Sequence, residues 1–264
     1  MAMEFFINEI LDDEEGKELL RTDKERAAKG KAIADEYAVS RKKPPMEDDI
    51  LPLFVLAHLA DYTRKEQEAL GIPHEITVAS LRDVNLWIGN YRNVHGKFGV
   101  MEFDWLLYHW RSEIFRIGRL QFRPLKARES TPSGEYELEV HIPQGEPLKP
   151  EACLDSFERA KEFMAKIYPE KKFDYFVCSS WLLSPHLANF LPEDGNTVRF
   201  MRMWTIHSLA ETQSNAVTSR ILRMGMKREE LTADTPAVTS MQKALKEYLL
   251  AGGDFRDGRG YRKA

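Results

Sequence analysis

Apolar residues recur every three or four positions through the first 110 residues, which is the spacing of helices with one buried face. Pro44 and Pro45 interrupt this pattern, because paired prolines favour extended chain. The pattern predicts helices over residues 3–11, 14–39, 50–70, 76–93 and 103–110. We therefore expect a helical N-terminal domain over residues 1–112.

From residue 114 the apolar period shortens towards two, which is the period of strands. Residues 114–124 and 136–142 alternate, and the polar segment 127–134 between them predicts an antiparallel hairpin. The remaining expected elements are a strand over 197–206, helices over 209–224 and 236–250, and a solvated tail over 254–264. Residues 113–264 are therefore expected to form a second, α/β domain.

A strand, a loop, a helix and a second strand follow one another between residues 136 and 184. The helix, over 150–168, starts with Pro150 at a first-turn position, where no intrahelical N–H bond is lost. The second strand, over 173–178, is nearly all apolar or aromatic, as in strands covered on both faces. A crossover of this length predicts parallel strands with a right-handed connection. The loop after Ile142 and the residues after Cys178 then share the carboxyl edge of the sheet, where ligands bind.

The charge balance narrows the classes of partner. With 42 acidic and 38 basic residues the net charge is −4, whereas a nucleic-acid-binding protein usually has a basic face. The apolar run at 50–57 is too short to span a bilayer, so neither a nucleic acid nor a membrane is expected as partner. The two cysteines fit no disulfide framework or zinc motif, and residues 1–11 do not resemble a signal peptide. We expect a cytoplasmic protein that uses no metal.

Short motifs follow one another through the second domain: IGRLQFRP at 117–124, HIPQGEPL at 141–148, FDYFVCSSWLL at 173–183, and DT with MQKAL between 234 and 245. In these motifs the second half resembles the GNAT-like C-terminal domain of a bacterial two-domain family, the acyltransferase domain-containing proteins. The helical first half resembles that family's N-terminal domain. The resemblance implies a GNAT-like mixed sheet with flanking helices. It also implies an enzyme that transfers an acyl group from acyl-CoA or acetyl-CoA to an amine of a small molecule or peptide.

The resemblance implies cofactor-binding roles for particular residues. In N-acyltransferases of this type, the strand before the main helix supplies backbone groups to the pantetheine arm. The turn into that helix holds the pyrophosphate against the positive helix end. The matching positions imply cofactor-binding roles for Val140, Ile142, Gln144, Gly145 and Lys149.

The loop over residues 143–149 departs from the glycine-rich pattern of such turns. Only Gly145 supplies glycine flexibility, prolines at 143, 147 and 150 remove N–H donors, and Glu146 repels a phosphate. This departure favours an alternative: a non-catalytic GNAT-like protein that has lost coenzyme A and binds a small metabolite or a protein partner.

The strand before the loop carries the candidate catalytic groups. Glu137, Glu139 and His141 share one face of it, since alternate residues of a strand point the same way. His141 or Glu139 is the candidate general base for an amine acceptor. The competing interpretations are a solvated strand edge, and a histidine bonded to a turn carbonyl.

The segment after the second strand is expected to contact the substrate, through Ser179, Ser180 and Trp181. Cys178, directly before them, raises a further alternative, a hydrolase or ligase that uses this thiol as nucleophile. Because no partner motif accompanies Cys178, a buried cysteine that packs as a small apolar residue is the preferred interpretation.

Arg119 and Arg123 share a face of the strand predicted over 114–124 and are candidates to bind a carboxylate or phosphate of the substrate. The favoured alternative pairs them with Glu137 and Glu139 across the hairpin, since opposite charges commonly pair on adjacent strands.

Overall fold

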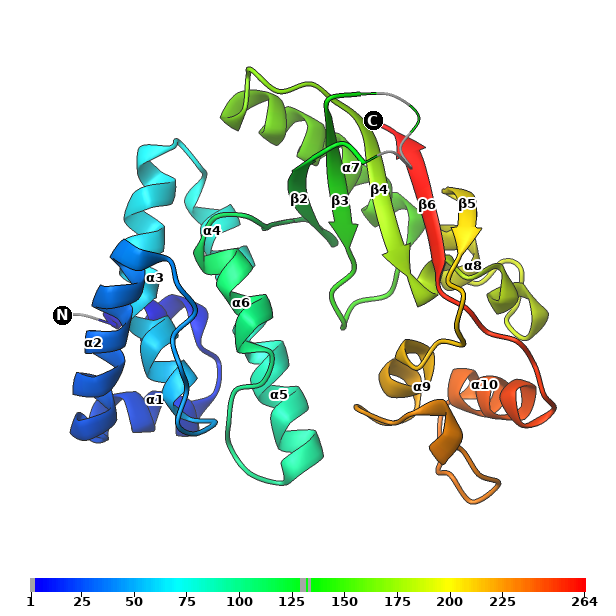
Figure 1. The fold of residues 1–264 in the computed structure, drawn as a ribbon, viewed down its shortest axis with the longest axis horizontal. Helices are drawn as coiled ribbons and strands as arrows, with labels where there is room; N and C mark the ends of the chain where they lie inside the picture. Colours follow the sequence, from blue (N-terminus) through cyan, green and yellow to red (C-terminus); the bar gives the residue numbers. More distant parts are fainter. Residues whose placement is uncertain (1–2, 129–131, 133) are drawn as a thin grey trace. The chain divides into compact units, whose positions relative to one another are not determined.

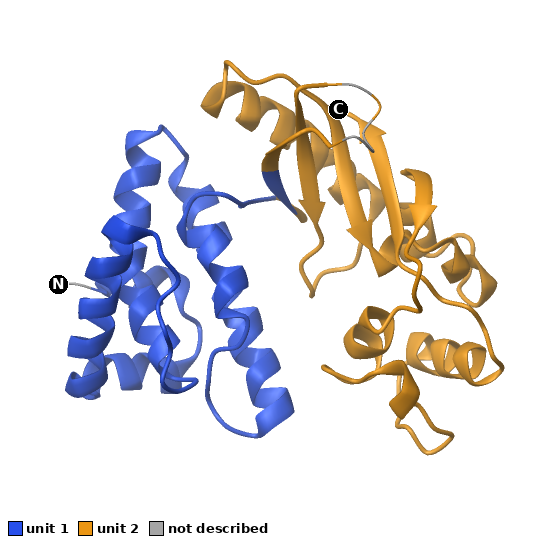
Figure 2. Ribbon diagram, viewed as in Figure 1, with its two compact units in different colours: residues 1–117, 121–123 blue, residues 118–120, 124–264 orange. Residues whose placement is uncertain are grey.

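The computed structural model describes residues 3–128, 132 and 134–264. The chain forms two compact units, shown in different colours in Figure 2. Unit 1 comprises Met1–Ile117 and Gln121–Arg123, and unit 2 comprises Gly118–Leu120 and Pro124–Ala264. Residues 129–131 and 133 of the turn predicted over 127–134 lie outside the described residues.

Unit 1 is mainly helical, as the apolar period predicts (Figure 1). Asp23 and Arg82 divide two of the predicted helices, and the Asp23 carboxylate accepts a bond from the backbone N–H of Arg26 at 3.0 Å and so caps the following helix. The elements are a π-helical turn η1 (Phe6–Ile10) and helices α1 (Glu14–Thr22), α2 (Lys24–Ser40), α3 (Leu51–Ala69), α4 (His74–Leu81), α5 (Asp83–His95) and α6 (Phe103–Trp110).

Helix α3 forms the centre of the core of unit 1. Its residues Leu53, Phe54 and Leu56 are fully buried, and the Leu56 carbonyl accepts a bond from the Trp110 indole at 2.9 Å. Helix α2 approaches α3 closely at Gly30, where a Cβ atom would lie 2.6 Å from that of Phe54. The glycine is therefore required for the packing of these two helices.

A six-stranded sheet follows, in the spatial order β1-β2-β3-β4-β6-β5. Strands β3 and β4 are parallel, and β6 is antiparallel to both β4 and β5. The parallel pairing of β3 with β4 confirms that the strands on either side of the helix over 150–168 are parallel, as predicted. The mixed sheet confirms the predicted fold class. The strands are β1 (Phe115–Ile117), β2 (Leu120–Lys126), β3 (Tyr136–His141), β4 (Phe173–Ser180), β5 (Thr205–Leu209) and β6 (Gly258–Lys263).

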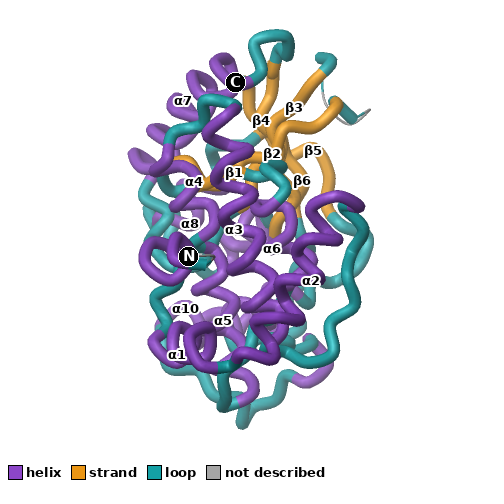
Figure 3. Tube along the Cα trace, turned by 90° about the vertical axis from the view of Figure 1, so that its left-hand side faces the viewer, coloured by secondary structure: helices purple, strands orange, loops and turns teal. Residues whose placement is uncertain are grey.

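Helix α7 (Pro150–Ile167) connects β3 to β4 and lies on one face of the sheet (Figure 3). Its buried Phe157 packs on Phe176 of β4, with ring centroids 4.7 Å apart. Leu138 of β3 pairs with Phe176 and is also fully buried. Because side chains alternate along a strand, Glu139 and His141 belong to the opposite face.

Three sequence predictions in this region are wrong, and the helix predicted over 236–250 begins later than expected. Residues 114–124 form two strands, because Gly118 adopts φ 63° and the Gly118-Arg119 turn reverses the chain. Residues 197–206 form helix α8 (Asn196–Met201) and then enter β5, because Val198 and Met201, three apart, are buried in one apolar cluster.

Only α9 (Ala216–Ile221) occupies the helix predicted over 209–224, and α10 (Ser240–Leu250) begins after a capping box at Thr239. Three short 3₁₀ turns complete the elements: η2 (Trp181–Leu183), η3 (Pro185–Asn189) and η4 (Arg228–Glu230).

The predicted solvated tail is also wrong, because residues 258–263 form β6, an interior strand between β4 and β5 (Figure 1). Its close neighbours explain the glycines of this segment. A Cβ atom at Gly258 would lie 2.2 Å from the Leu183 carbonyl oxygen, and one at Gly260 would lie 3.0 Å from that of Thr205. Backbone pairing and close approach, rather than an apolar pattern, place this strand.

Candidate functional site

The carboxyl ends of β3 and β4 meet at one edge of the sheet. Their parallel register begins with the pair Tyr136 and Phe173 and, in the part of the chain that the structure describes, ends with Glu139 and Val177. Strand β4 then continues beside β6 as far as the pair Ser180 and Gly258. The loop after β3 and the segment after β4 therefore leave the sheet at the same edge, as predicted.

The loop over residues 143–149 has a buried base and an exposed tip. Pro143 and Leu148 are buried, whereas residues 144–147 are exposed. Gly145 adopts φ 121° at the tip, with open space on the side of a would-be Cβ atom. Lys149 is exposed at the N-cap of α7, so its cation adds to the positive end of that helix.

The buried side chain of Arg119 holds this loop from beneath. Its Nε donates to the Glu146 carbonyl oxygen at 2.8 Å, and its Nη1 donates to that of Pro143 at 3.0 Å. The Arg119 backbone N–H donates to Oγ of Ser156 on α7 at 2.7 Å. One residue thus connects the turn after β1, the loop and the helix, while its role in substrate binding stays a prediction.

Glu139 and His141 are brought together on the face opposite α7. Oε2 of Glu139 lies 3.0 Å from Nε2 of His141, and Oε1 lies 3.2 Å from Nη2 of Arg128. Arg128 also binds the fully buried carboxylate of Glu137 through Nε at 2.5 Å. Arg128, a residue of the connection between β2 and β3, was not among the sequence candidates.

These contacts keep Glu139 ionised. The hydrogen bond from His141 lowers the pKa of Glu139 from 4.5 to about 2, helped by the charges of His141 and Arg128 and opposed by burial. A carboxylate of such low basicity is a poor proton acceptor at neutral pH. It is suited instead to orient the imidazole through the contact with Nε2.

The last two residues of β4 and the first residue of η2 differ in the exposure of their side chains. Ser179 is exposed, and because Val177 pairs with Glu139, Ser179 lies on the same sheet face as Glu139. The Ser180 hydroxyl accepts from the Leu182 N–H at 3.1 Å and caps the turn η2. Trp181 is half-buried at the start of that turn.

Arg259 is a further candidate site residue, which the sequence did not point to. It pairs with Ser179 in the β4–β6 register, and its side chain is exposed. Residues 258–261 alternate glycine with Arg259 and Tyr261, which is a strand-like period and was the only signal of this position in the sequence.

Arg123 belongs to unit 1 and makes its described contacts there. Its Nη2 lies 3.2 Å from Oε2 of Glu113, and its guanidinium lies 4.1 Å from the ring centroid of Tyr108. A role for Arg123 in substrate binding stays a prediction.

The alternative based on a cysteine nucleophile loses its support. Cys178 is 4% exposed, and burial raises the pKa of its thiol well above the usual range. Cys153 on α7 is fully buried, and burial raises its pKa to about 11. Neither thiol supplies a thiolate at neutral pH.

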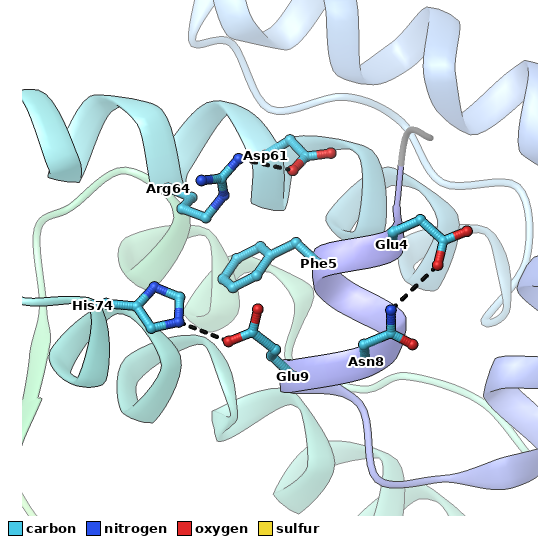
Figure 4. Close-up of a pocket in the computed structure, with 7 residues that line it drawn as sticks. All are labelled: Glu4, Phe5, Asn8, Glu9, Asp61, Arg64 and His74. Atoms are coloured by element: carbon cyan, nitrogen blue, oxygen red, sulfur yellow. Dashed lines mark hydrogen bonds and ion pairs between the residues drawn. The ribbon is translucent and has the colours of Figure 1, made fainter.

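A separate cavity of about 370 Å³ lies on unit 1 (Figure 4). Its charged groups pair with one another: His74 with Glu9 at 2.6 Å and Arg64 with Asp61 at 3.7 Å. The Arg64 guanidinium also lies 5.4 Å from the ring centroid of Phe5. These polar groups therefore have partners within the lining of the cavity itself.

Within residues 3–128, 132 and 134–264, no group of three or more His, Cys, Asp or Glu side chains is placed to hold a metal ion. Over the same described part of the chain, no helix combines the length and the apolar character needed to cross a membrane.

A helical domain joined to a mixed sheet with a parallel β3–α7–β4 unit defines a two-domain protein of GNAT-like class. A model of the N-acyltransferase N-terminal domain matches residues 3–112, and a model of the GNAT-like C-terminal domain matches residues 114–262. The chain belongs to the family that combines these two domains. This confirms the predicted family and the assignment to the acyltransferases.

The fold is similar to those of solved acyltransferase structures. One, in complex with decanoyl-CoA and teicoplanin, is 24% identical with a TM-score of 0.78, and the match covers 98% of this chain and 86% of that chain. A mutant in complex with octanoyl-CoA gives the same identity, TM-score and coverage. A third, in complex with CoA and 10C-teicoplanin, is 24% identical with a TM-score of 0.75, covering 96% of this chain and 89% of that chain. No curated protein matches the chain in sequence.

Proposed function

We propose that this protein transfers an acyl group from an acyl-CoA thioester to an amine of a small molecule or peptide, at the edge where β3 and β4 end. The observation that carries the proposal is the convergence at that edge of the loop over 143–149, the Glu139–His141 pair and Ser179. Support also comes from the two domain models and from the complexes of similar acyltransferases with CoA and its esters.

The loop offers the groups that an acyl-CoA co-substrate requires. Its tip is exposed, Lys149 supplies a cation at the start of α7, and two of its carbonyl oxygens face Arg119. The exposed carboxylate of Glu146 opposes an anion but can turn to solvent. Gln144, Gly145 and Lys149 are the proposed contacts to the phosphates.

Backbone groups of β3, at Val140 and Ile142, are the proposed contacts to the pantetheine arm. The amide groups of that arm are hydrogen-bonding partners for strand backbone. The side chain of Val140 is buried on the face that α7 covers, so only its backbone is available to a ligand.

His141 is the proposed general base. With Nε2–H donated to Glu139, the lone pair of the neutral imidazole lies on Nδ1. As the acceptor nitrogen attacks the thioester carbonyl, a C–N bond forms, and Nδ1 takes the proton from nitrogen. The C–S bond then breaks, and the coenzyme A thiolate leaves and receives the proton.

The acceptor side is proposed to include Ser179, Ser180 and Trp181, while substrate-binding roles for Arg119 and Arg123 stay predictions. The solved structures with teicoplanin support testing glycopeptide amines as acceptors, and those with decanoyl-CoA and octanoyl-CoA support testing medium-chain donors.

Thermal unfolding tests donor binding directly. Acetyl-CoA, octanoyl-CoA, decanoyl-CoA and free coenzyme A are each added up to millimolar concentration. A ligand at 100 times its Kd should raise the free energy of unfolding by about 2.7 kcal/mol and so raise the melting temperature. Gly145→Trp should abolish the rise by filling the loop tip, whereas Val238→Trp, at a position 81% exposed in unit 2, should retain it.

Release of free thiol from acyl-CoA in the presence of amine acceptors then tests transfer. Binding without any release over a broad acceptor panel favours the non-catalytic alternative. No melting shift with any of the four ligands rules out the proposed function and leaves the alternative that has lost coenzyme A, which the prolines of the loop favour.

A further inference from the structure

A buried side chain beneath the loop over 143–149 donates to two carbonyl oxygens of the loop. Arg119 is 5% exposed, and its guanidinium donates to the carbonyls of Pro143 and Glu146, at the two ends of the exposed tip. Ser156 holds the same residue from α7 by accepting its backbone N–H. The buried Arg119 therefore links the loop to the helix.

The direction of these carbonyls matters for an anionic ligand. The described part of the chain has no cis peptide, and in a trans peptide the C=O and the next N–H point in opposite directions. Since the Pro143 oxygen faces Arg119, the Gln144 N–H is directed away from it. The Glu146 oxygen belongs to the peptide of Pro147, which has no N–H to lose.

Two consequences follow for charge. Carbonyl oxygens that would repel a phosphate are turned inward onto a cation, and a positive charge lies beneath the loop. These effects compensate for the donors that the three prolines remove.

We propose that Arg119 is a positioning residue, which holds the 143–149 loop in the form that receives the anionic part of the acyl-CoA co-substrate. This rests on the proposed function. Two donors of one planar guanidinium reach two different carbonyls, a geometry that the single ammonium of lysine does not reproduce. Arg119→Lys should therefore restore only part of what Arg119→Ala removes.

A spin label tests the loop without any ligand. Gln144 is exposed whereas both native thiols are buried, so a Gln144→Cys variant can be labelled selectively. The label should become clearly more mobile with Arg119→Ala, and millimolar guanidinium should reduce the mobility again. Arg159→Ala, which removes a half-exposed arginine of α7 paired with Asp155, is the matched control and should leave mobility unchanged. Equal mobility with and without Arg119 overturns the proposal.

Coenzyme A affinity of the unlabelled variants tests the second part of the proposal, that the loop held by Arg119 receives the co-substrate. Arg119→Ala should weaken binding roughly 10- to 100-fold, the range for losing hydrogen bonds to a charged group. Arg119→Lys should fall between, Arg159→Ala should match the wild type, and kcat at saturating donor should change less than KM. A mobile loop with unchanged affinity overturns the role in ligand positioning. A wild type that binds no coenzyme A refutes the proposed function, while the spin label still decides whether Arg119 orders the loop.

Discussion

Oε2 of Glu139 lies 3.0 Å from Nε2 of His141, two residues further along the same strand. The alternation of a strand places both side chains on one face, and Arg128 completes the arrangement from the other side of Glu139. The proposed mechanism therefore gives the pair two tasks: the carboxylate stays charged and orients the ring, and the ring takes the proton of the acceptor.

Removing the base should affect turnover more than binding. We expect His141→Ala to lower kcat by roughly 10²- to 10⁴-fold, the usual contribution of a general base, with little change in donor affinity. Glu139→Gln should lower kcat by a smaller factor, because the ring loses its orienting charge but keeps its nitrogen. Steady-state kinetics of thiol release measures both. Glu158→Gln, on the exposed side of α7, is the control, and wild-type kcat in both site variants would exclude the assigned roles.

Asp83 in the interior of unit 1 should be required for stability. Its Oδ2 accepts from the indoles of Trp87 and Trp105 at 2.9 Å each, and its Oδ1 accepts from Gln121 at 2.8 Å. Asp83→Asn removes the charge and places an amide N–H₂ against donors, so unfolding free energy should fall by roughly 3 kcal/mol. Denaturant unfolding measures the loss. Asp12→Asn, at an exposed pair with Arg82, should cost less than about 1 kcal/mol.

The same carboxylate predicts an acid-sensitive step. Burial acts to raise the pKa of Asp83, but the hydrogen bond and charge of His109 and the two indole N–H groups lower it from 3.8 to about 2. Because the folded value is the lower one, the stabilisation is complete above pH 3.8 and is lost as pH falls towards 2. Unfolding free energy should drop across this window in the wild type and drop less in Asp83→Asn. Parallel curves would show that Asp83 does not cause the drop.

The two thiols should be unreactive in the folded protein. Cys153 and Cys178 are buried, and burial raises the pKa of both. A mild thiol reagent at pH 7.5 should label fewer than about one site per chain until denaturant is added. Rapid labelling of Cys178, together with loss of transfer activity, would restore the nucleophile alternative.

Two glycines should respond to alanine in opposite ways. Gly258→Ala would place Cβ 2.2 Å from the Leu183 carbonyl oxygen and should destabilise the protein by about 1–3 kcal/mol. Gly89→Ala, within α5 and with open space around it, should stabilise by about 0.5–1 kcal/mol. Thermal or denaturant unfolding of both variants checks the signs. A neutral Gly258→Ala would show that β6 can shift to admit a methyl group.

The β3–α7–β4 unit could be predicted because its signals are local. Alternation in residues 136–142, helical spacing with Pro150 at the start, and an apolar second strand each define their own element. Strand alternation alone predicted that Glu139 and His141 share one face, whereas the contact between them comes from the structure. The division of the chain at residues 112 and 113 stays a prediction, which limited proteolysis would test.

The errors occurred where long-range contacts decide the structure. Strand β6 has two glycines and three basic residues among six, so its sequence carries little apolar pattern, and its pairing with β4 and β5 determines its conformation. The bonds of Arg119 to the loop could not be predicted, because no sequence pattern shows that a turn at Gly118 directs its side chain under a loop more than twenty residues later. Arg128 was missed because its partners, Glu137 and Glu139, lie on β3 and come close to it only when the hairpin forms.

The interior position of β6 has a consequence for the order of folding. Ser180 of β4 pairs with Gly258 of β6. Strand β5 and the helices α8, α9 and α10 lie between these two residues in the sequence. Such distant contacts require closure of a long chain loop first, which slows folding, whereas unit 1 consists mainly of successive helices. We expect unit 1 to acquire its protected amides early and the sheet of unit 2 to close in a slower phase. The sheet edge at which β3 and β4 end is then complete only after β6 has paired with β4.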